Sequence, residues 1–243
     1  MTPTSRIPVP IVALDVGSAS EAMALARRVG DGCAFFKVGS ELFTAEGPSI
    51  VRRIREELGA DVFLDLKFHD IPNTVAGSVR SAAELGARLV TVHAGGGREM
   101  LRAAQVAAAE AGGGCGILAV TVLTSLDAPA LAAAWGRPSV EVECEVLRLA
   151  EEAAAAGVHG IVCSGVEAAA VHAAHGEALA MLVPGIRFAG GDAHDQRRVM
   201  TPAAARAAGA RYVILGRAVT AASDPRGAMA RARTELGVEL GPQ

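Results

Sequence analysis

Short apolar runs alternate along the chain with longer stretches in which apolar residues recur at helical spacing. The short runs are rich in Val, Ile, Leu and Phe and are nearly continuous, which is typical of parallel strands covered on both faces. Eight such runs are predicted as strands, at 10–15, 34–38, 62–67, 89–93, 116–123, 160–163, 180–184 and 212–215.

Ala-rich stretches between these runs predict helices. They lie near 19–29, 47–58, 73–86, 97–111, 140–156, 166–174, 201–208 and 221–236. Asn73 and Thr201 are suitable N-caps, and Pro202 suits the first helical position. Glycines stand where helices are expected to stop, at 59, 86, 112, 157 and 209.

Eight strand–helix units in 243 residues predict a single α/β domain over residues 1–243, a TIM (β/α)8 barrel. No linker or low-complexity segment suggests a second domain. A doubly wound open sheet is the structural alternative, because periodicity alone does not exclude it. The longest irregular segment, 124–139, follows the fifth strand, where a barrel places an active-site loop, and a short helix is expected in it at 127–134.

Composition narrows the class of protein. The chain is 51% apolar and has a net charge of −3, which argues against a nucleic-acid partner, although a local cluster of cations can still hold a small anion. Its first residues are too broken by Pro to form a secretory signal. No run approaches the roughly 20 apolar residues that span a bilayer. We therefore expect a cytoplasmic protein with no membrane partner.

Cysteine and histidine spacing gives no sign of a metal or a disulfide. Cys33, Cys115, Cys144 and Cys163 form no CxxC pair, and the first and last lie in strand-like runs that favour buried free thiols. His172 and His175 are three apart on a predicted helix but have no acidic partner, so we interpret both as surface residues.

Polar residues gather at the carboxyl ends of the predicted strands, which in a barrel converge on one mouth. A solvated strand end explains any one of them but is a poor account of the whole set. Its members are Asp15, Lys37, Asp65, Lys67, His93, Thr124, Ser125, Arg187, Gly216 and Arg217.

The densest cluster is DLKFHDIPNT, from Asp65 to Thr74. Asp65 and Lys67 are two residues apart, so in a regular strand they point to the same face. A carboxylate and an ammonium buried together need partners and often mark a reaction centre. A purely structural ion pair is the alternative reading.

The stretches after strands seven and eight suit a phosphate. PGIR places Arg187 beyond strand seven, the loop 190–202 carries Gln196, and Gly216-Arg217 closes strand eight. Phosphate sites in TIM barrels usually form from these two loops. Gly-rich backbone and a forked guanidinium both suit a phosphate dianion.

Together these stretches resemble the orotidine 5′-phosphate decarboxylases in their bacterial form. The similarity runs in order through VALDV, FFKVGSELF, FLDLKFHDIPNT, TVHAGGG, VTVLTS, IVCSG, PGIR, DQRRVMTP and YVILGRAVTAASDP. It implies a homodimer of TIM barrels that converts orotidine 5′-monophosphate to uridine 5′-monophosphate, the last step of UMP synthesis, without cofactor or metal. Two departures, CSGVEA for CSAQEA and Val16 for Phe, touch no site residue.

The resemblance also implies roles for individual residues. Lys67 would donate the proton within a charge array that includes Lys37, Asp65 and Asp70. Asp70 and Thr74 would reach into the partner's site. The ribose would contact Asp15, Lys37 and Thr74, the pyrimidine would contact Thr124 and Ser125, and the phosphate end would comprise Arg187, Gln196, Gly216 and Arg217.

Two other functions remain open at this point. A metal-dependent sugar-phosphate lyase similar to hexulose-phosphate synthase shares a DxKxxD strand, but it uses an acidic ligand on strand two, where this chain has Lys37 and only then Glu41. A non-catalytic phosphosugar-binding barrel is the second alternative, and retention of the charged array argues against it.

Overall fold

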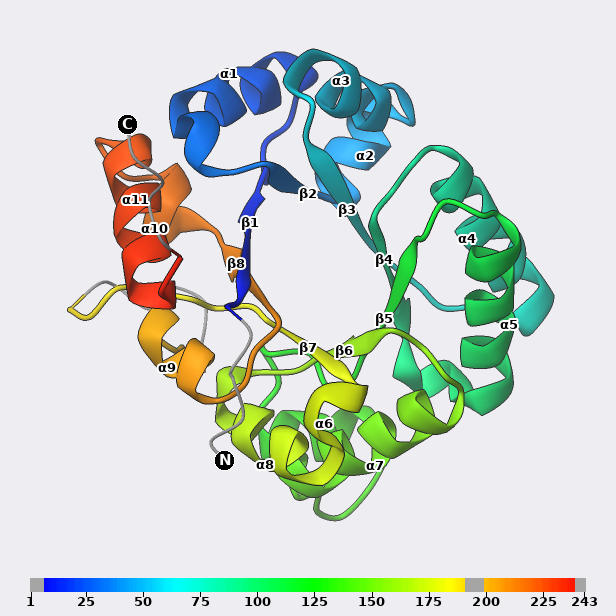
Figure 1. Ribbon diagram of the computed structural model, residues 1–243. Helices are drawn as coiled ribbons and strands as arrows, with labels where there is room; N and C mark the ends of the chain where they lie inside the picture. Colours follow the sequence, from blue (N-terminus) through cyan, green and yellow to red (C-terminus); the bar gives the residue numbers. More distant parts are fainter. Residues whose placement is uncertain (1–6, 191–198, 239–243) are drawn as a thin grey trace.

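The structure is a computed structural model that describes residues 7–190 and 199–238. Eight parallel strands pair in sequence order, and β1 pairs with β8 to close a barrel. Figure 1 looks along the barrel axis and shows the helices forming an outer ring. This closure confirms the TIM barrel and excludes the open doubly wound sheet. The strands are β1 (Val9–Ala13), β2 (Phe35–Gly39), β3 (Asp61–Phe68), β4 (Leu89–His93), β5 (Gly116–Val120), β6 (Gly160–Val162), β7 (Ala180–Val183) and β8 (Tyr212–Leu215).

Most helices lie within two residues of their predicted bounds. The α-helices are α1 (Ala19–Val29), α2 (Ser40–Glu46), α3 (Ser49–Leu58), α4 (Pro72–Glu84), α5 (Gly97–Glu110), α6 (Ala128–Ala134), α7 (Val142–Ala155), α8 (Gly165–His175), α9 (Pro202–Ala207), α10 (Arg217–Thr220) and α11 (Pro225–Leu236). Short 3-10 turns are η1 (Gly30–Gly32), η2 (Ala94–Gly96) and η3 (Gly176–Ala178). No helix within the described ranges is long and apolar enough to cross a membrane.

Three local predictions were wrong. The helix α2 was missed, because Gly47 and Pro48 end it after seven residues and separate it from α3. The last predicted helix, 221–236, begins only at Pro225, because the Asp224 side chain caps α11 by accepting from Gly227 N–H, and the short helix α10 before it was missed. Asn73 is not a cap, because Pro72 already occupies the first turn of α4. The Thr201 cap is confirmed: its side chain accepts a hydrogen bond from Ala204 N–H.

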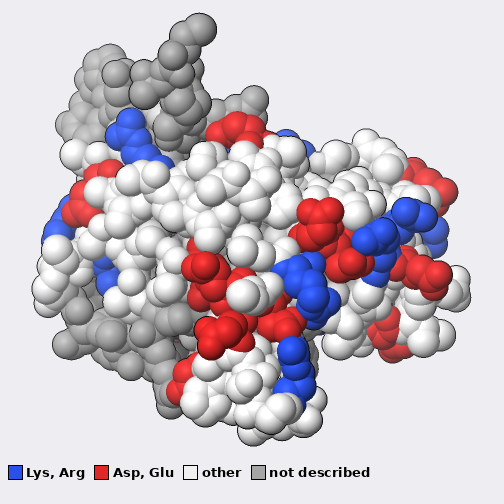
Figure 2. Space-filling model, turned by 90° about the horizontal axis from the view of Figure 1, so that it is seen from below, with Lys and Arg blue, Asp and Glu red and all other residues white. Residues whose placement is uncertain are grey.

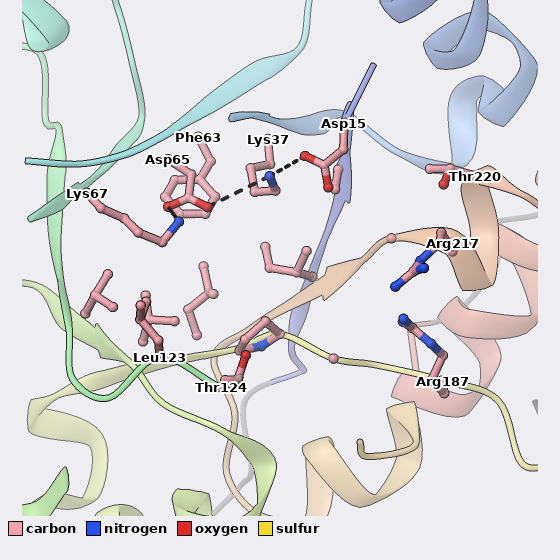
Figure 3. A pocket seen from close by; sticks show the side chains of 18 of the residues that line it. Asp15, Lys37, Phe63, Asp65, Lys67, Leu123, Thr124, Arg187, Arg217 and Thr220 are labelled. Carbon is pink, nitrogen blue, oxygen red and sulfur yellow. Dashed lines mark hydrogen bonds and ion pairs between the residues drawn. The ribbon is translucent and has the colours of Figure 1, made fainter. Parts of the chain in front are cut away.

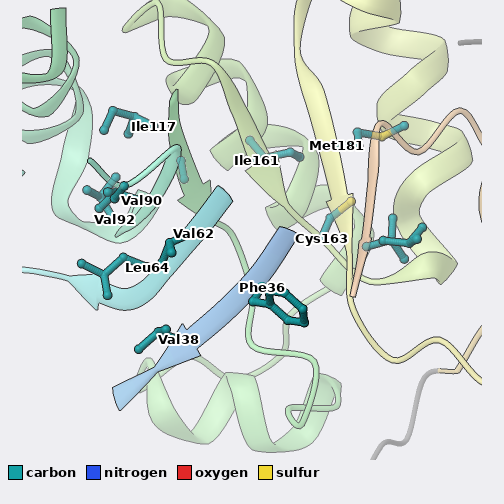
Figure 4. Close-up of a cluster of buried hydrophobic side chains, with 14 of the residues drawn as sticks. Phe36, Val38, Val62, Leu64, Val90, Val92, Ile117, Ile161, Cys163 and Met181 are labelled. Carbon is teal, nitrogen blue, oxygen red and sulfur yellow. The ribbon is translucent and has the colours of Figure 1, made fainter. Parts of the chain in front are cut away.

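Alternation along the strands divides the core into two parts. One set of side chains fills the barrel interior, including Phe35, Phe63, Leu118 and Ile214. The residues between them face outward and pack under the helices, and Figure 4 shows this outer layer with Phe36, Val38, Val62, Leu64, Val90, Val92, Ile117, Ile161, Cys163 and Met181 labelled. The barrel is therefore a packed scaffold that presents its strand ends at fixed positions.

Charged side chains of both signs lie on the face of the barrel that Figure 2 shows. Figure 2, which views the side that is lowest in Figure 1, shows acidic and basic side chains interspersed rather than gathered in a basic patch. Ion pairs on α7 link Glu145 to Arg137 and Arg148, and Glu152 to Arg98. This face has none of the continuous positive charge that nucleic-acid binding requires.

Candidate active site

A cavity of about 500 Å³ opens at the carboxyl ends of the strands. Figure 3 shows charged side chains from β1, β2 and β3 on one side of it and two arginines from the ends of β7 and β8 on another. Strand ends far apart in sequence thus converge at one mouth, as the polar pattern predicted. The predicted residues that line the cavity are Asp15, Lys37, Asp65, Lys67, Thr124, Arg187, Gly216 and Arg217.

Carboxylates and ammonium groups alternate across the first side. Lys37 Nζ lies 2.6 Å from Asp15 Oδ1 and 3.8 Å from Asp65 Oδ2. Lys67 Nζ donates to Asp65 Oδ1 at 2.9 Å. Lys37 and Asp65 are the most enclosed, with side-chain exposures of 11% and 15%, so each needs the opposite charges beside it. A four-membered array opening into a cavity is more than the isolated ion pair considered from the sequence.

The backbone at Lys67 departs from a regular strand. β3 pairs with β4 through Leu64↔Val90 and Phe68↔Val92, so three residues on β3 lie opposite one residue, Thr91, on β4. Within this bulge Lys67 has φ +51°, the one positive value at a non-glycine residue in the described chain. Such a conformation costs of order 1–3 kcal/mol and persists only where the surroundings hold it.

Thr91 holds the bulge with both functions of its hydroxyl. Lys67 N–H donates to Thr91 Oγ1 at 2.8 Å, and Thr91 Oγ1 donates to Asp65 Oδ1 at 3.0 Å. With the bond from Lys67 Nζ to the same Asp65 oxygen, the three hydrogen bonds close a ring. Sequence reasoning missed Thr91, because it lies in the middle of the apolar run LVTVH.

Two guanidinium groups form the other side of the cavity. Arg187 is buried, with 8% exposure, and its Nη1 donates to the carbonyl of Ile186 at 2.8 Å. In Figure 3 its nitrogens point toward those of Arg217. Burial, and then the positive charge of Arg217, lower the pKa of Arg187. An anion bound between the two groups would offset this repulsion.

Apolar side chains line the space between the two charged sides. Phe63 and Ala13 come two residues before Asp65 and Asp15, so each shares the inner face with the charged residue that follows it. That spacing is the signal that could have identified them from the sequence. The remaining apolar lining comes from Val120, Val122, Leu123, Val162, Leu182, Pro184 and Ile214.

Other predicted site residues are not among those that line this cavity. Asp70, Thr74 and Ser125 are exposed on the single chain. Asp70 Oδ1 accepts a hydrogen bond from Ile71 N–H at 2.6 Å, and Ile71 is itself 67% exposed. The Gln196 prediction lies outside the described residues.

Two histidines, His69 and His93, lie near Lys67. His69 and His93 stack with ring centroids 5.3 Å apart. Partial burial lowers the pKa of His93, and the charges of His69 and Lys67 act in the same direction.

No group of three or more His, Cys, Asp or Glu side chains within residues 7–190 and 199–238 is arranged to hold a metal ion. The four cysteines are free thiols, three of them buried.

Comparison with known proteins agrees with this geometry. A model of the "Orotidine 5'-phosphate decarboxylase / HUMPS family" matches residues 8–232. Orotidine 5'-phosphate decarboxylases of Anaeromyxobacter dehalogenans and Halorhodospira halophila are 52% and 50% identical to the chain, over 94% and 93% of its length and 96% and 94% of theirs. The crystal structure of the Lactobacillus acidophilus decarboxylase has a TM-score of 0.82 at 34% identity and covers 94% of this chain and 98% of that one. The chain belongs to the orotidine 5′-phosphate decarboxylase / HUMPS family.

Proposed function

We propose that this protein works in the cytoplasm as a decarboxylase of orotidine 5′-monophosphate, with Lys67 as the proton donor. The conversion to uridine 5′-monophosphate is the reaction for which its curated relatives are named. The observation that carries the assignment of residues is the alternating array of Asp15, Lys37, Asp65 and Lys67 at one side of a cavity that has two arginines at the other.

The reaction needs a cation beside the carbon that loses CO2. In orotidine 5′-monophosphate the carboxylate is attached to C6 of the pyrimidine ring. When the bond between C6 and the carboxylate breaks, its electron pair stays on C6 in an orbital that cannot delocalise into the ring. The Lys67 ammonium can stabilise this localised charge directly and then transfer a proton from Nζ to C6. In this mechanism the lysine takes the place of an electron-sink cofactor. Water later returns a proton to Nζ.

The other members of the array fix the lysine and the sugar. Asp65 accepts from Lys67 Nζ at 2.9 Å, which holds the lysine side chain in place at this side of the cavity. Asp15 and Lys37 lie next to each other, between Lys67 on one side and the two arginines on the other. We place the ribose hydroxyls there. Thr124 lines the cavity and is assigned to the pyrimidine, with Ser125 beside it in the chain.

We assign the phosphate to Arg187 and Arg217, together with the backbone at Gly216 and the side chain of Gln196. The two guanidinium groups offer forked donors that match a phosphate dianion. Because the phosphate does not react, its binding energy can be used to close the mouth and exclude water, so its loss should lower kcat as well as raise KM.

A homodimer completes the proposal. Asp70 and Thr74 are exposed on the single chain, and the strongly exposed Ile71 lies between them in sequence. Neither Asp70 nor Thr74 lines the cavity of the candidate site in its own chain. An exposed apolar residue beside them fits an interface that brings them to a neighbouring site. In this arrangement Asp70 of one subunit would flank Lys67 of the other.

Mixing two inactive variants tests the shared site. Lys67→Ala and Asp70→Asn homodimers should each be inactive, but in a mixed dimer one site has both groups intact. Unfolding and refolding the two together should restore roughly a quarter of the wild-type activity, as random pairing of subunits predicts. No recovery, with mixed dimers demonstrated by differently tagged chains, would contradict a shared site.

A metal-dependent sugar-phosphate lyase is the alternative enzyme that the sequence leaves open, and a metal requirement separates the two functions. Lys37, not an acidic residue, lines the cavity from β2, which favours the decarboxylase. The experiment is to follow the loss of orotidine absorbance with orotidine 5′-monophosphate in excess EDTA. Sustained turnover supports the proposal. Absence of turnover with and without added divalent metal would overturn it and leave a binding barrel.

A further inference from the structure

We propose that Thr91 is a positioning residue for the reaction, because it fixes Lys67 in its left-handed backbone conformation and aims Asp65 at the lysine. The inference rests on the proposed function and goes beyond it. Thr91 has an exposed fraction of 0% and is not among the residues that line the cavity, so it acts through its two partners and not on the substrate.

The geometry requires a group that both accepts and donates. Thr91 Oγ1 accepts from the backbone N–H of Lys67 at 2.8 Å and donates to Asp65 Oδ1 at 3.0 Å. A hydroxyl has both functions, and the second partner is a carboxylate, which makes that bond a charge-assisted one. Removal of the hydroxyl leaves the Lys67 N–H and one Asp65 acceptor site without this partner.

The bulge makes this contact specific to the site. Lys67 and Thr91 are not matched by regular strand register, since β3 carries two extra residues between the pairs Leu64↔Val90 and Phe68↔Val92. A regular ladder bond therefore does not hold the Lys67 amide, and the threonine side chain replaces it. β-branching also leaves Thr91 few side-chain rotamers, so it makes a stiff anchor.

Loss of the anchor should act on the chemical step. The φ of +51° at Lys67 is disfavoured, and without Thr91 the backbone can relax toward regular strand and move Nζ away from its place. Misplacement of a reacting group by about 1 Å can cost on the order of 100-fold in rate. The arginine side of the cavity is not in contact with Thr91, so affinity for the nucleotide should change little.

Three variants of the full-length protein test this. Thr91→Val keeps the shape and removes the hydroxyl, and Thr91→Ser keeps the hydroxyl. The matched control is Thr121→Val, since Thr121 is also buried and donates its hydroxyl at 2.8 Å, but to the backbone carbonyl of Val162. Steady-state kinetics with orotidine 5′-monophosphate, inhibition by the product uridine 5′-monophosphate, and urea unfolding are measured for each.

We expect Thr91→Val to lose on the order of 100-fold in kcat with KM and the inhibition constant within about threefold. Thr91→Ser should recover to within about tenfold of wild type, and Thr121→Val should stay within about threefold. A Thr91→Val variant as active as Thr121→Val, or one in which only KM and product affinity suffer, would overturn the inference.

If Thr91→Val does not fold, Thr91→Ala, which cannot clash, replaces it with the same expected loss of kcat. Failure of the proposed function would look different, because wild-type protein would then not turn over orotidine 5′-monophosphate at all. Folded Thr91→Ser with as large a loss as Thr91→Val would likewise contradict a role for the hydroxyl.

Discussion

Lys67 Nζ reaches Asp65 Oδ1 at 2.9 Å from a backbone that is not a regular strand. The two residues are separated by one position, and simple alternation predicts that both point to the barrel interior. The two side chains do meet, but the regular strand geometry behind that expectation was wrong, because a bulge and a positive φ intervene. The contact at the centre of the site is therefore built by a local distortion that requires support from β4.

Arg217→Ala should weaken binding of the phosphate. We expect kcat/KM for orotidine 5′-monophosphate to fall by about 10²- to 10³-fold, in line with the loss of a charge-assisted contact. The same variant should show little change with orotidine, which has no phosphate. Steady-state kinetics with the two substrates measure the difference.

The control for this variant lies at the other end of β8. Arg211 precedes the strand, where its Nη1 donates to the carbonyl of Ile7, whereas Arg217 follows the strand. Arg211→Ala should leave both substrates within about threefold of wild type. Equal losses with nucleotide and nucleoside in Arg217→Ala would show that Arg217 does not recognise the phosphate.

Protonation of His93 should destabilise the fold. Partial burial lowers the pKa of His93 below its ordinary 6.5. As pH falls below about 6.5, the unfolded chain takes up a proton here before the folded chain does, so the free energy of unfolding decreases. Above that pH the neutral imidazole is present in both states and the contribution is constant.

Urea unfolding between pH 5 and pH 7.5 measures this effect. We expect His93→Asn to lose less stability between about pH 6.5 and pH 5 than the wild type loses, whatever its stability at pH 7.5. Parallel curves for the two proteins across the acidic range would show that His93 does not carry the effect.

Cys144 should be the reactive thiol of the folded protein. It is exposed on α7, whereas Cys33, Cys115 and Cys163 are buried. Burial also raises the pKa of Cys115 to about 11, which keeps it in the unreactive thiol form. Titration with a thiol reagent at pH 8 should give one rapid equivalent per chain, and guanidinium should expose the remaining three.

Cys144→Ser provides the check on that count. The variant should show no rapid equivalent and should keep full decarboxylase activity, because Cys144 is outside the cavity. A rapid equivalent that persists in the variant would place a reactive thiol at one of the three positions described as buried.

Much of the fold follows from local patterns. Near-continuous apolar runs and intervening helical stretches predict a parallel α/β fold, and their number predicts a barrel. The break between α2 and α3 is harder, because a seven-residue helix has too little periodicity to stand out from its neighbours. Closure of the sheet through β1 and β8 is a long-range property that no local pattern contains.

The site shows a similar division. Charged residues at strand ends were predictable, because parallel strands bring their carboxyl ends to one mouth. Thr91 was not, since its importance comes from contacts to residues 24 and 26 positions earlier in the chain. The roles of Asp70 and Thr74 belong to an assembly, and the single chain gives only their exposure.

The most direct test of the account is the decarboxylation rate of Lys67→Ala under saturating orotidine 5′-monophosphate. The side chain is 39% exposed at the mouth, so the variant should fold, which circular dichroism and urea unfolding can verify. We expect kcat to fall by at least about 10⁴-fold, since both charge stabilisation and proton transfer are lost, while product inhibition persists through the arginine side. Near wild-type turnover in folded Lys67→Ala would contradict the proposed role of Lys67.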